Sequence, residues 1–205
     1  MAPTIRPAAK SDIETLYDIC VRTADGGQDA RGQLDDDRLW GDVFAVPYLR
    51  FAPDHAYVLD DGTGQAVGYV LGTADIAAFA ARLRDEWVPL TRDRIPMPPD
   101  PPVTLQDNLR AVHYHPEWRV SPELTAYPAD LHIDLLPEWR GRGYGRALMA
   151  ALVDGLRTAG VDGVHLEMLK TNTGARRFYD RLGFTEFPVA GPPHLTTLVR
   201  DTSPL

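Results

Sequence analysis

The hydrophobic pattern is clearest in the segment 131–156, where a strand period gives way to a helix period. Apolar residues occupy positions 131, 133 and 135, and the polar residues His132 and Asp134 lie between them. This alternation predicts a strand with one polar face. Pro137 ends the strand, because proline has no N–H to give to a neighbouring strand. Apolar residues then recur at helical spacing, which predicts an amphipathic helix from about Gly143.

The same two periods predict a mixture of strands and helices along the rest of the chain. Further strands are predicted at residues 4–6, 56–59, 66–71, 164–169, 185–188 and 195–200. Helices are predicted at about 103–112 and at 172–182, and three more are predicted to begin at Ser11, at 35–37 and at Asp75. Ser11 and Glu14 have the spacing of a capping box, which supports a helix start there.

The turn between the strand and the helix, residues 140–146 with the sequence RGRGYGR, is rich in glycine and arginine. Glycines let the backbone approach a ligand closely, and the unpaired N–H groups of a helix N-terminus favour an anion. No Lys-Ser/Thr pair follows the glycines, which excludes a P-loop, and Arg146 stands where a dinucleotide fingerprint needs its third glycine. The turn is therefore predicted to bind a different phosphate ligand, the alternative being a basic surface turn.

A second motif lies further along the chain, in the segment 172–184. It has the pattern N-x-x-A-x-x-F-Y-x-x-L-G-F, and the turn has the pattern R-x-x-G-x-G. In this order, after strands, the two motifs resemble the signatures of the GNAT acetyltransferase superfamily. The resemblance covers residues 129–200.

The resemblance implies an α/β (α+β) GNAT fold. Its sheet should be mixed, mostly antiparallel and splayed near the middle, with helices on both faces. Residues 1–205 should form a single domain with a large insertion at about 74–128, before the central strand. The insertion and the segment 127–137 are similar to the acetyltransferase-like C-terminal domain of animal O-GlcNAcase and its stand-alone bacterial relatives. The animal domain is regarded as a pseudo-acetyltransferase, so the alternative function is a catalytically silent binding module.

The implied activity is transfer of acetyl from acetyl-CoA directly to an amine, without a covalent enzyme intermediate. The strand backbone should contact the pantetheine arm, and the turn should hold the pyrophosphate. Arg176 could instead be solvated, and Asn172 could instead cap its helix. The residues expected to contact acetyl-CoA are Leu135, Leu136, Arg140, Gly141, Arg142, Gly143, Tyr144, Gly145, Arg146, Asn172, Ala175, Arg176, Phe178 and Tyr179.

Two catalytic roles follow from the resemblance. Tyr179 should stabilise the leaving CoA thiolate, although its place in an apolar stripe also fits simple packing. An amine of pKa ~10.4 is largely protonated at neutral pH, so a general base is needed. Asp134 is the first candidate for this base and Glu167 the second. His113 and His115, in the insertion, are expected to line the acceptor pocket, and no metal motif accompanies them.

Charge and composition narrow the partners. The net charge of −8 argues against nucleic acid, and no apolar run is long enough for a membrane helix. Residues 138–182 nevertheless carry eight Lys/Arg against five Asp/Glu, which suits a polyanionic cofactor on an acidic body. The acceptor is expected to be a cationic amine or a protein lysine. A single cysteine, Cys20, and an N-terminus without a signal peptide predict a cytoplasmic protein.

Overall fold

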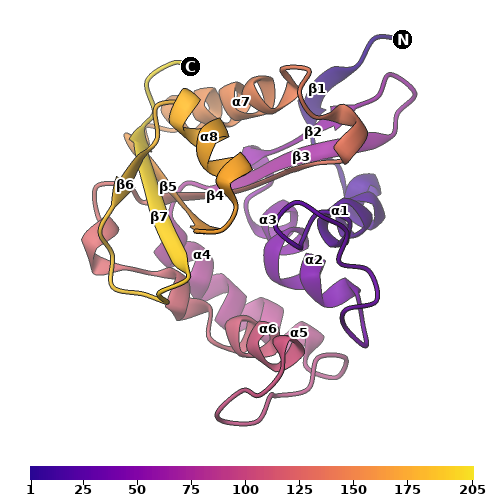
Figure 1. Ribbon diagram of the computed structural model, residues 1–205, viewed down its shortest axis with the longest axis vertical. Helices are drawn as coiled ribbons and strands as arrows, with labels where there is room; N and C mark the ends of the chain where they lie inside the picture. Colours follow the sequence, from indigo (N-terminus) through magenta and orange to yellow (C-terminus); the bar gives the residue numbers. More distant parts are fainter.

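A seven-stranded sheet runs through the protein, with helices on both of its faces (Figure 1). The computed structural model describes residues 1–205. The strand order is β1-β2-β3-β4-β5-β7-β6, and every neighbouring pair is antiparallel except β4 and β5. The strands are β1 (Thr4–Pro7), β2 (Ala56–Asp60), β3 (Ala66–Thr73), β4 (Ala129–Leu135), β5 (Gly163–Leu169), β6 (Thr185–Phe187) and β7 (Leu195–Asp201). The predicted mixed, mostly antiparallel sheet is confirmed.

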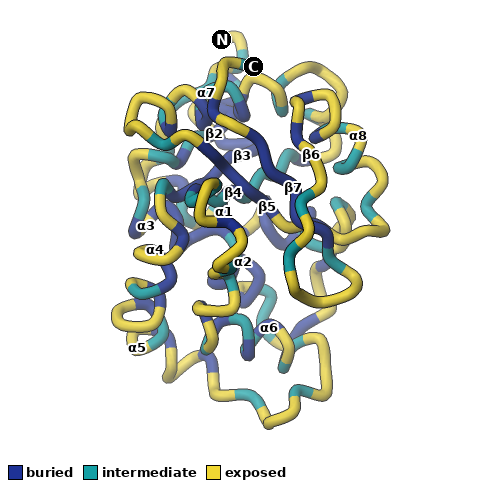
Figure 2. The backbone as a smooth tube through the Cα atoms, turned by 90° about the vertical axis from the view of Figure 1, so that its left-hand side faces the viewer, coloured by how far each residue is buried: buried dark blue, intermediate teal, exposed yellow.

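Helices pack on opposite faces of the sheet and in a further layer below it. They are α1 (Ile13–Val21), α2 (Arg38–Phe44), α3 (Val46–Phe51), α4 (Ile76–Arg82), α5 (Val88–Thr91), α6 (Leu105–Tyr114), α7 (Tyr144–Thr158) and α8 (Thr173–Arg181). Helix α7 packs on β2, β3 and β4, and Gly72 of β3 lies against Leu152 of α7. Tyr69, an odd number of residues away on β3, points to the other face, where α1 and α3 pack. Both faces of β3 are therefore covered, and β3 is buried along its whole length (Figure 2).

The sheet opens between β4 and β5. The two strands pair in parallel only at Ala129 with Val164 and at Asp130 with His165, although both continue for several residues beyond. From that point the strands diverge toward their carboxyl ends. This splay is the one that the sequence motifs implied.

The insertion, residues 74–128, packs below the sheet as α4, a π-helical turn η3 (Leu83–Trp87), α5 and α6 (Figure 1). A buried carboxylate, Asp42 of α2, ties it to the rest of the protein. Arg94 donates two hydrogen bonds to Asp42, at 2.6 and 2.8 Å, and the indole N–H of Trp87 donates to the Asp42 carbonyl. The insertion is therefore a packed layer, and none of the helices in the protein is long and apolar enough to cross a membrane.

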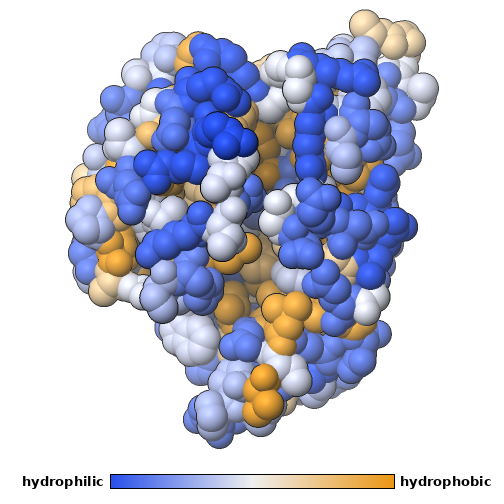
Figure 3. All heavy atoms as spheres, in the orientation of Figure 1, coloured by the Kyte–Doolittle hydropathy of each residue, from blue (hydrophilic) through white to orange (hydrophobic).

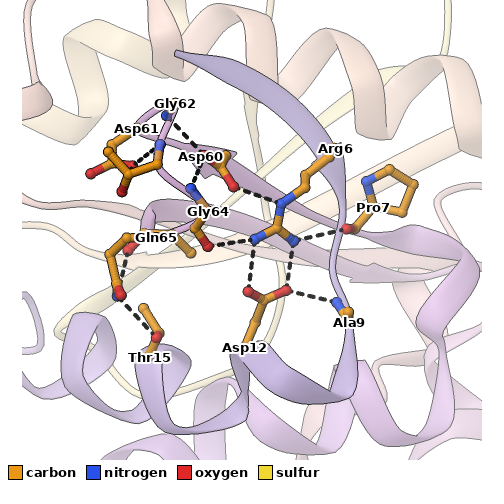
Figure 4. Close-up of polar contacts among 12 residues, drawn as sticks. Arg6, Pro7, Ala9, Asp12, Thr15, Asp60, Asp61, Gly62, Gly64 and Gln65 are labelled. Carbon is orange, nitrogen blue, oxygen red and sulfur yellow. Dashed lines mark hydrogen bonds and ion pairs between the residues drawn. The ribbon is translucent and has the colours of Figure 1, made fainter. Parts of the chain in front are cut away.

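The first helix starts differently from the prediction (Figure 4). Ser11 does not cap it. The carboxylate of Asp12 accepts the backbone N–H of Ala9 and two hydrogen bonds from Arg6, at 2.7 and 2.9 Å. Arg6 also donates to Asp60, so one guanidinium joins β1, the start of α1 and the β2–β3 turn. The capping-box prediction was wrong, because the guanidinium of Arg6, on the preceding strand, holds Asp12 at the helix start.

Candidate active site

The open side of β4 presents free backbone groups to the gap in the sheet. The N–H of Leu136 donates to the carbonyl of Val67 on β3 at 3.1 Å. Since residues of an antiparallel strand alternate in direction, Ile133 and Leu135 direct their N–H and C=O groups toward β5. The predicted contact with pantetheine thus fits Leu135, whereas the N–H of Leu136 is already used within the sheet.

The turn after β4 leaves a run of backbone donors without acceptors. The six N–H groups from Gly141 to Arg146 make no hydrogen bond to any protein atom. Gly141 and Gly143 have φ angles of +72° and +86°, a region open to glycine, and Gly143 is the N-cap of α7. These donors and the positive end of a 15-residue helix could hold an anion.

Arginines surround this turn, and they differ in how free they are. Arg142 and Arg146 are exposed and form no ion pair, while the Nε of Arg140 donates to the Leu135 carbonyl at 2.8 Å. Arg176 on α8 is bound to Asp180 and to Glu186 at 2.8 Å each. Arg142 and Arg146 are therefore better placed than Arg176 to meet phosphate oxygens.

The second motif forms the start of α8 and brings it against the turn. The side chain of Asn172 accepts the N–H of Ala175 at 3.0 Å, so the predicted helix cap is present. A Cβ at Gly145 would lie 3.1 Å from the ring of Phe178, so glycine allows α7 and α8 to meet closely here. Both motifs thus border the same gap, and Figure 3 shows the surface hollowed between α8 and the α1–α2 side, with an apolar floor.

Tyr179, on α8, is only 8% exposed, and its hydroxyl has no hydrogen-bond partner. Burial raises its pKa, and the negative charges of Asp134 and Asp130 raise it further. The phenol is therefore a neutral hydrogen-bond donor throughout the physiological pH range.

Asp134, on β4, is the centre of a polar cluster on the α1 side of the sheet. The hydroxyl of Tyr69 donates to its carboxylate at 2.9 Å and lies 3.2 Å from Nδ1 of His132. The ring of Phe44 stacks on His132 at 5.6 Å. The Asp134 side chain is 17% exposed, and burial raises its pKa. A carboxylate with a raised pKa is a suitable general base.

Tyr69 was missed by the sequence analysis. It lies in the continuous apolar run of β3, which predicts only packing. Its partners come from β4, about 65 residues later, so no local signal indicates them. The one signal for this contact is the tyrosine itself, which is the only hydroxyl-bearing side chain in the run 66–71. It becomes informative only when β3 is known to pair with a strand that carries polar residues.

Glu167, on β5, faces the gap from the other side. It makes no hydrogen bond or ion pair, and burial together with the charge of Asp130 raises its pKa. The residue as a whole is nonetheless exposed, so water solvates its charge better than that of Asp134. Asp130 itself accepts the hydroxyl of Tyr48, and His165 donates to the carbonyl of Tyr127 at 2.7 Å.

The two histidines of the insertion do not both line a pocket. His113 is 4% exposed and bonds the hydroxyl of Thr91 at 2.9 Å, and burial lowers its pKa to about 4. The prediction for His113 was therefore wrong. His115 is exposed, stacks on Trp118 and pairs with Glu117. No group of three or more His, Cys, Asp or Glu side chains could hold a metal ion.

The family profile described as acetyltransferase (GNAT) family matches residues 111–184. The crystal structure of SsHAT superposes with a TM-score of 0.94 at 50% sequence identity, over 99% of this chain and 100% of that one. The chain belongs to the GNAT acetyltransferase family.

Two further comparisons place this GNAT domain. Protein O-GlcNAcase of Rattus norvegicus is 28% identical over 185 residues, which are 89% of this chain and 20% of the rat protein. The chain thus spans about a fifth of the length of that relative. YncA of Salmonella typhimurium, solved with its cofactor acetyl-CoA, shares the fold at 17% identity and a TM-score of 0.57, covering 99% of this chain and 95% of YncA. The predicted family and the resemblance to O-GlcNAcase are confirmed.

Proposed function

We propose that this GNAT protein is an acetyl-CoA-dependent N-acetyltransferase that transfers acetyl directly to an amine. The observation that carries the proposal is the run of six unpaired N–H groups at 141–146, immediately beside the free edge of β4. A pyrophosphate and a pantetheine arm need these two surfaces side by side.

In this proposal acetyl-CoA lies across the gap. The pyrophosphate accepts hydrogen bonds from the turn, and Arg142 and Arg146 balance its charge. The pantetheine arm pairs with the free backbone groups of Ile133 and with the N–H of Leu135 as an added strand would, since the Leu135 carbonyl already accepts from Arg140. The thioester then lies near Asp134 and Tyr179, between β4 and α8.

The chemistry follows from these groups. Asp134 takes a proton from the acceptor ammonium, and the neutral amine attacks the thioester carbonyl. The N–H of Leu135 stabilises the oxyanion that forms. The C–S bond breaks, the amine nitrogen loses its second proton, and the CoA sulfur gains one as thiol. Tyr179 stabilises the sulfur by a hydrogen bond, because full proton transfer from a phenol whose pKa is raised would be uphill.

The acceptor is a cationic amine, either small or a protein lysine. Three carboxylates border the gap, Asp130, Asp134 and Glu167, and none of them pairs with a lysine or arginine. An uncompensated negative site favours a positive ligand. The single, buried Cys20 is consistent with the proposed cytoplasmic location.

The binding step is tested by melting the protein with and without acetyl-CoA. A ligand at 100 times its Kd adds about 2.7 kcal/mol, which for this chain length raises Tm by roughly 5–10 °C. We expect Gly143→Asp to abolish this rise, because it places a carboxylate among the pyrophosphate donors. Gly160→Asp is the matched control, since Gly160 also has a positive φ (+76°) and open space around it, at the opposite end of α7. Equal loss of the rise in both variants, or no rise in the wild type at millimolar ligand, contradicts the proposal.

Turnover is tested separately by following the release of CoA thiol in the presence of amines. A rise in Tm together with CoA release supports the proposed acetyltransferase activity. A rise in Tm without CoA release from any amine supports the alternative function, a catalytically silent GNAT-like binding module.

A further inference from the structure

A buried hydroxyl lies directly behind the candidate base. Tyr69 is fully buried on β3, opposite Asp134 in the register of β3 and β4. Its oxygen is 2.9 Å from Oδ2 of Asp134 and 3.2 Å from Nδ1 of His132. The three side chains form one connected cluster at the edge of the gap.

The number of protons in this cluster determines which group donates and which accepts each hydrogen bond. A tyrosine hydroxyl has a single proton, and a carboxylate is the stronger acceptor. Tyr69 therefore donates to Asp134 and accepts from the Nδ1–H of His132. In this tautomer of the neutral ring Nε2 is the acceptor nitrogen, and it lies 3.7 Å from Oδ2 of Asp134.

No other side chain replaces Tyr69 in this role. The groups that face Asp134 are His132 on its own strand, Cys20 and Thr23 from α1 and its end, Arg140 from the turn, and Tyr179 from α8. The hydroxyl of Thr23 donates to the carbonyls of Ile19 and Cys20. Arg140 donates its Nε to Leu135, and forms no ion pair with Asp134. The hydrogen bond from Tyr69, at 2.9 Å, is thus the main one that the carboxylate receives, and the Thr23 hydroxyl is a weaker second contact.

We propose that Tyr69 is a positioning residue that holds Asp134, together with His132, as the proton acceptor for acetyl transfer. This inference rests on the proposed function. The acceptor ammonium loses a proton to Oδ of Asp134, so one N–H bond breaks and one O–H bond forms. His132 then passes that proton to solvent, and the carboxylate is restored for the next turnover.

The hydrogen bond also sets the pH at which the base works. A donor that bonds the charged form of a carboxyl group lowers its pKa, in opposition to burial. Without the Tyr69 hydroxyl, Asp134 stays protonated to a higher pH, and the acidic limb of the rate profile moves upward.

The test compares Tyr69→Phe with the wild type in the pH dependence of kcat/KM. CoA release from acetyl-CoA is measured from pH 5.5 to 9 with n-butylamine, spermidine and Nα-acetyl-lysine methylamide as probe acceptors. We expect the acidic limb to rise by about one pH unit in Tyr69→Phe, with about a tenfold loss of kcat/KM on the acidic side and recovery at high pH. The Kd for acetyl-CoA should not change.

Tyr48→Phe is the matched control. Tyr48 is also buried (2% exposed) and donates its hydroxyl to a β4 carboxylate, that of Asp130. Tyr48→Phe should lower Tm as Tyr69→Phe does, but the acidic limb of its kcat/KM profile should stay at the wild-type pH. If Tyr69→Phe releases CoA and the acidic limb of its pH profile does not move, the proposed role of Tyr69 is wrong. An equal shift of the limb in both variants leads to the same conclusion. The proposed acetyltransferase function is unaffected by either result. No CoA release by the wild type with any probe overturns the proposed function and this role with it.

Discussion

At the residue scale, two buried aspartates show that burial alone does not decide the behaviour of a carboxylate. Burial pushes the pKa of Asp12 upward, but the hydrogen bonds from Arg6 and Ala9 outweigh it and the pKa is lowered. Asp134 has no arginine partner, and its pKa is raised. The ionised carboxylate of Asp12 therefore stabilises the fold, whereas ionisation of Asp134 weakens it.

This contrast predicts opposite effects of the same substitution. Because the pKa of Asp134 is raised in the fold, ionisation of its carboxyl group lowers the stability of the native state. The full cost applies above the folded pKa, and there is no cost below the unfolded pKa of ~3.9. We expect Asp134→Asn to raise Tm at pH 8, and this gain to vanish as the pH falls to ~4. Urea or thermal unfolding at several pH values measures the difference, and a gain independent of pH would contradict the argument.

Asp12→Asn is the corresponding control. Its lowered pKa gives stability that is present above ~3.9 and lost as the pH falls through the folded value. We expect this substitution to cost about 2 kcal/mol at pH 7, because Arg6 loses its paired partner.

The sequence located Asp134 through the polar face of its strand, and it located the loop through glycine and arginine spacing. It placed the helix cap at Ser11, and it gave no indication of Tyr69. Both failures have the same physical cause. The partners that decide these positions, Arg6 and Asp134, reach them through tertiary contacts that no local pattern records.

At the element scale, the insertion is held by buried polar groups as well as by apolar packing. His113 of α6 bonds Thr91 at the end of α5, and its pKa is lowered to about 4 by burial. Above pH ~6.5 this histidine is neutral in the folded and in the unfolded chain, and its burial carries no protonation cost. Between ~6.5 and about 4 only the unfolded chain takes up the proton, so the unfolding free energy falls by about 3 kcal/mol over this range.

His113→Gln should therefore flatten the dependence of unfolding free energy on pH between ~6.5 and ~4. His115→Gln is the control, because the side chain of His115 is half exposed and outside the buried cluster. The measurement is chemical denaturation of the three proteins at pH 7, 5.5 and 4.5. An unchanged slope in His113→Gln would contradict the assignment of this histidine.

The helices of the two motifs were predictable to within a few residues, whereas α3 was not predicted. It follows α2 with almost no connection, and Pro47 near its start obscures a helical period. Its residues are buried against β3, so tertiary packing stabilises a helix of only six residues.

At the scale of the whole molecule, the sheet consists of two parts that share only two residue pairs. The β1–β4 part carries the free strand edge, and the β5–β7 part carries Glu167 and the strand that leads to α8. The mixed, mostly antiparallel sheet and its splay were implied by the family resemblance that the two motifs carry. The packing of the insertion could not be inferred, since it depends on the buried contact between Asp42 and Arg94.

Acetyl-CoA in the gap should connect the two parts. We expect hydrogen exchange to slow by up to roughly 100-fold at saturating ligand in the amides of 141–146 and of Leu135. The amides of α6 should exchange at an unchanged rate, because α6 lies in the insertion. Mass spectrometry of peptides from both regions makes the comparison, and uniform protection of the two would argue against binding in the gap.

The splay also leaves an unpaired strand edge within the fold. An open row of N–H and C=O groups is a template for strand addition by another chain, which is a route to aggregation. Here the Arg140 guanidinium covers the Leu135 carbonyl, and the carboxylates of Asp134 and Glu167 flank the opening. The same charges that we propose attract a cationic acceptor thereby also protect the open edge against a neighbouring polypeptide.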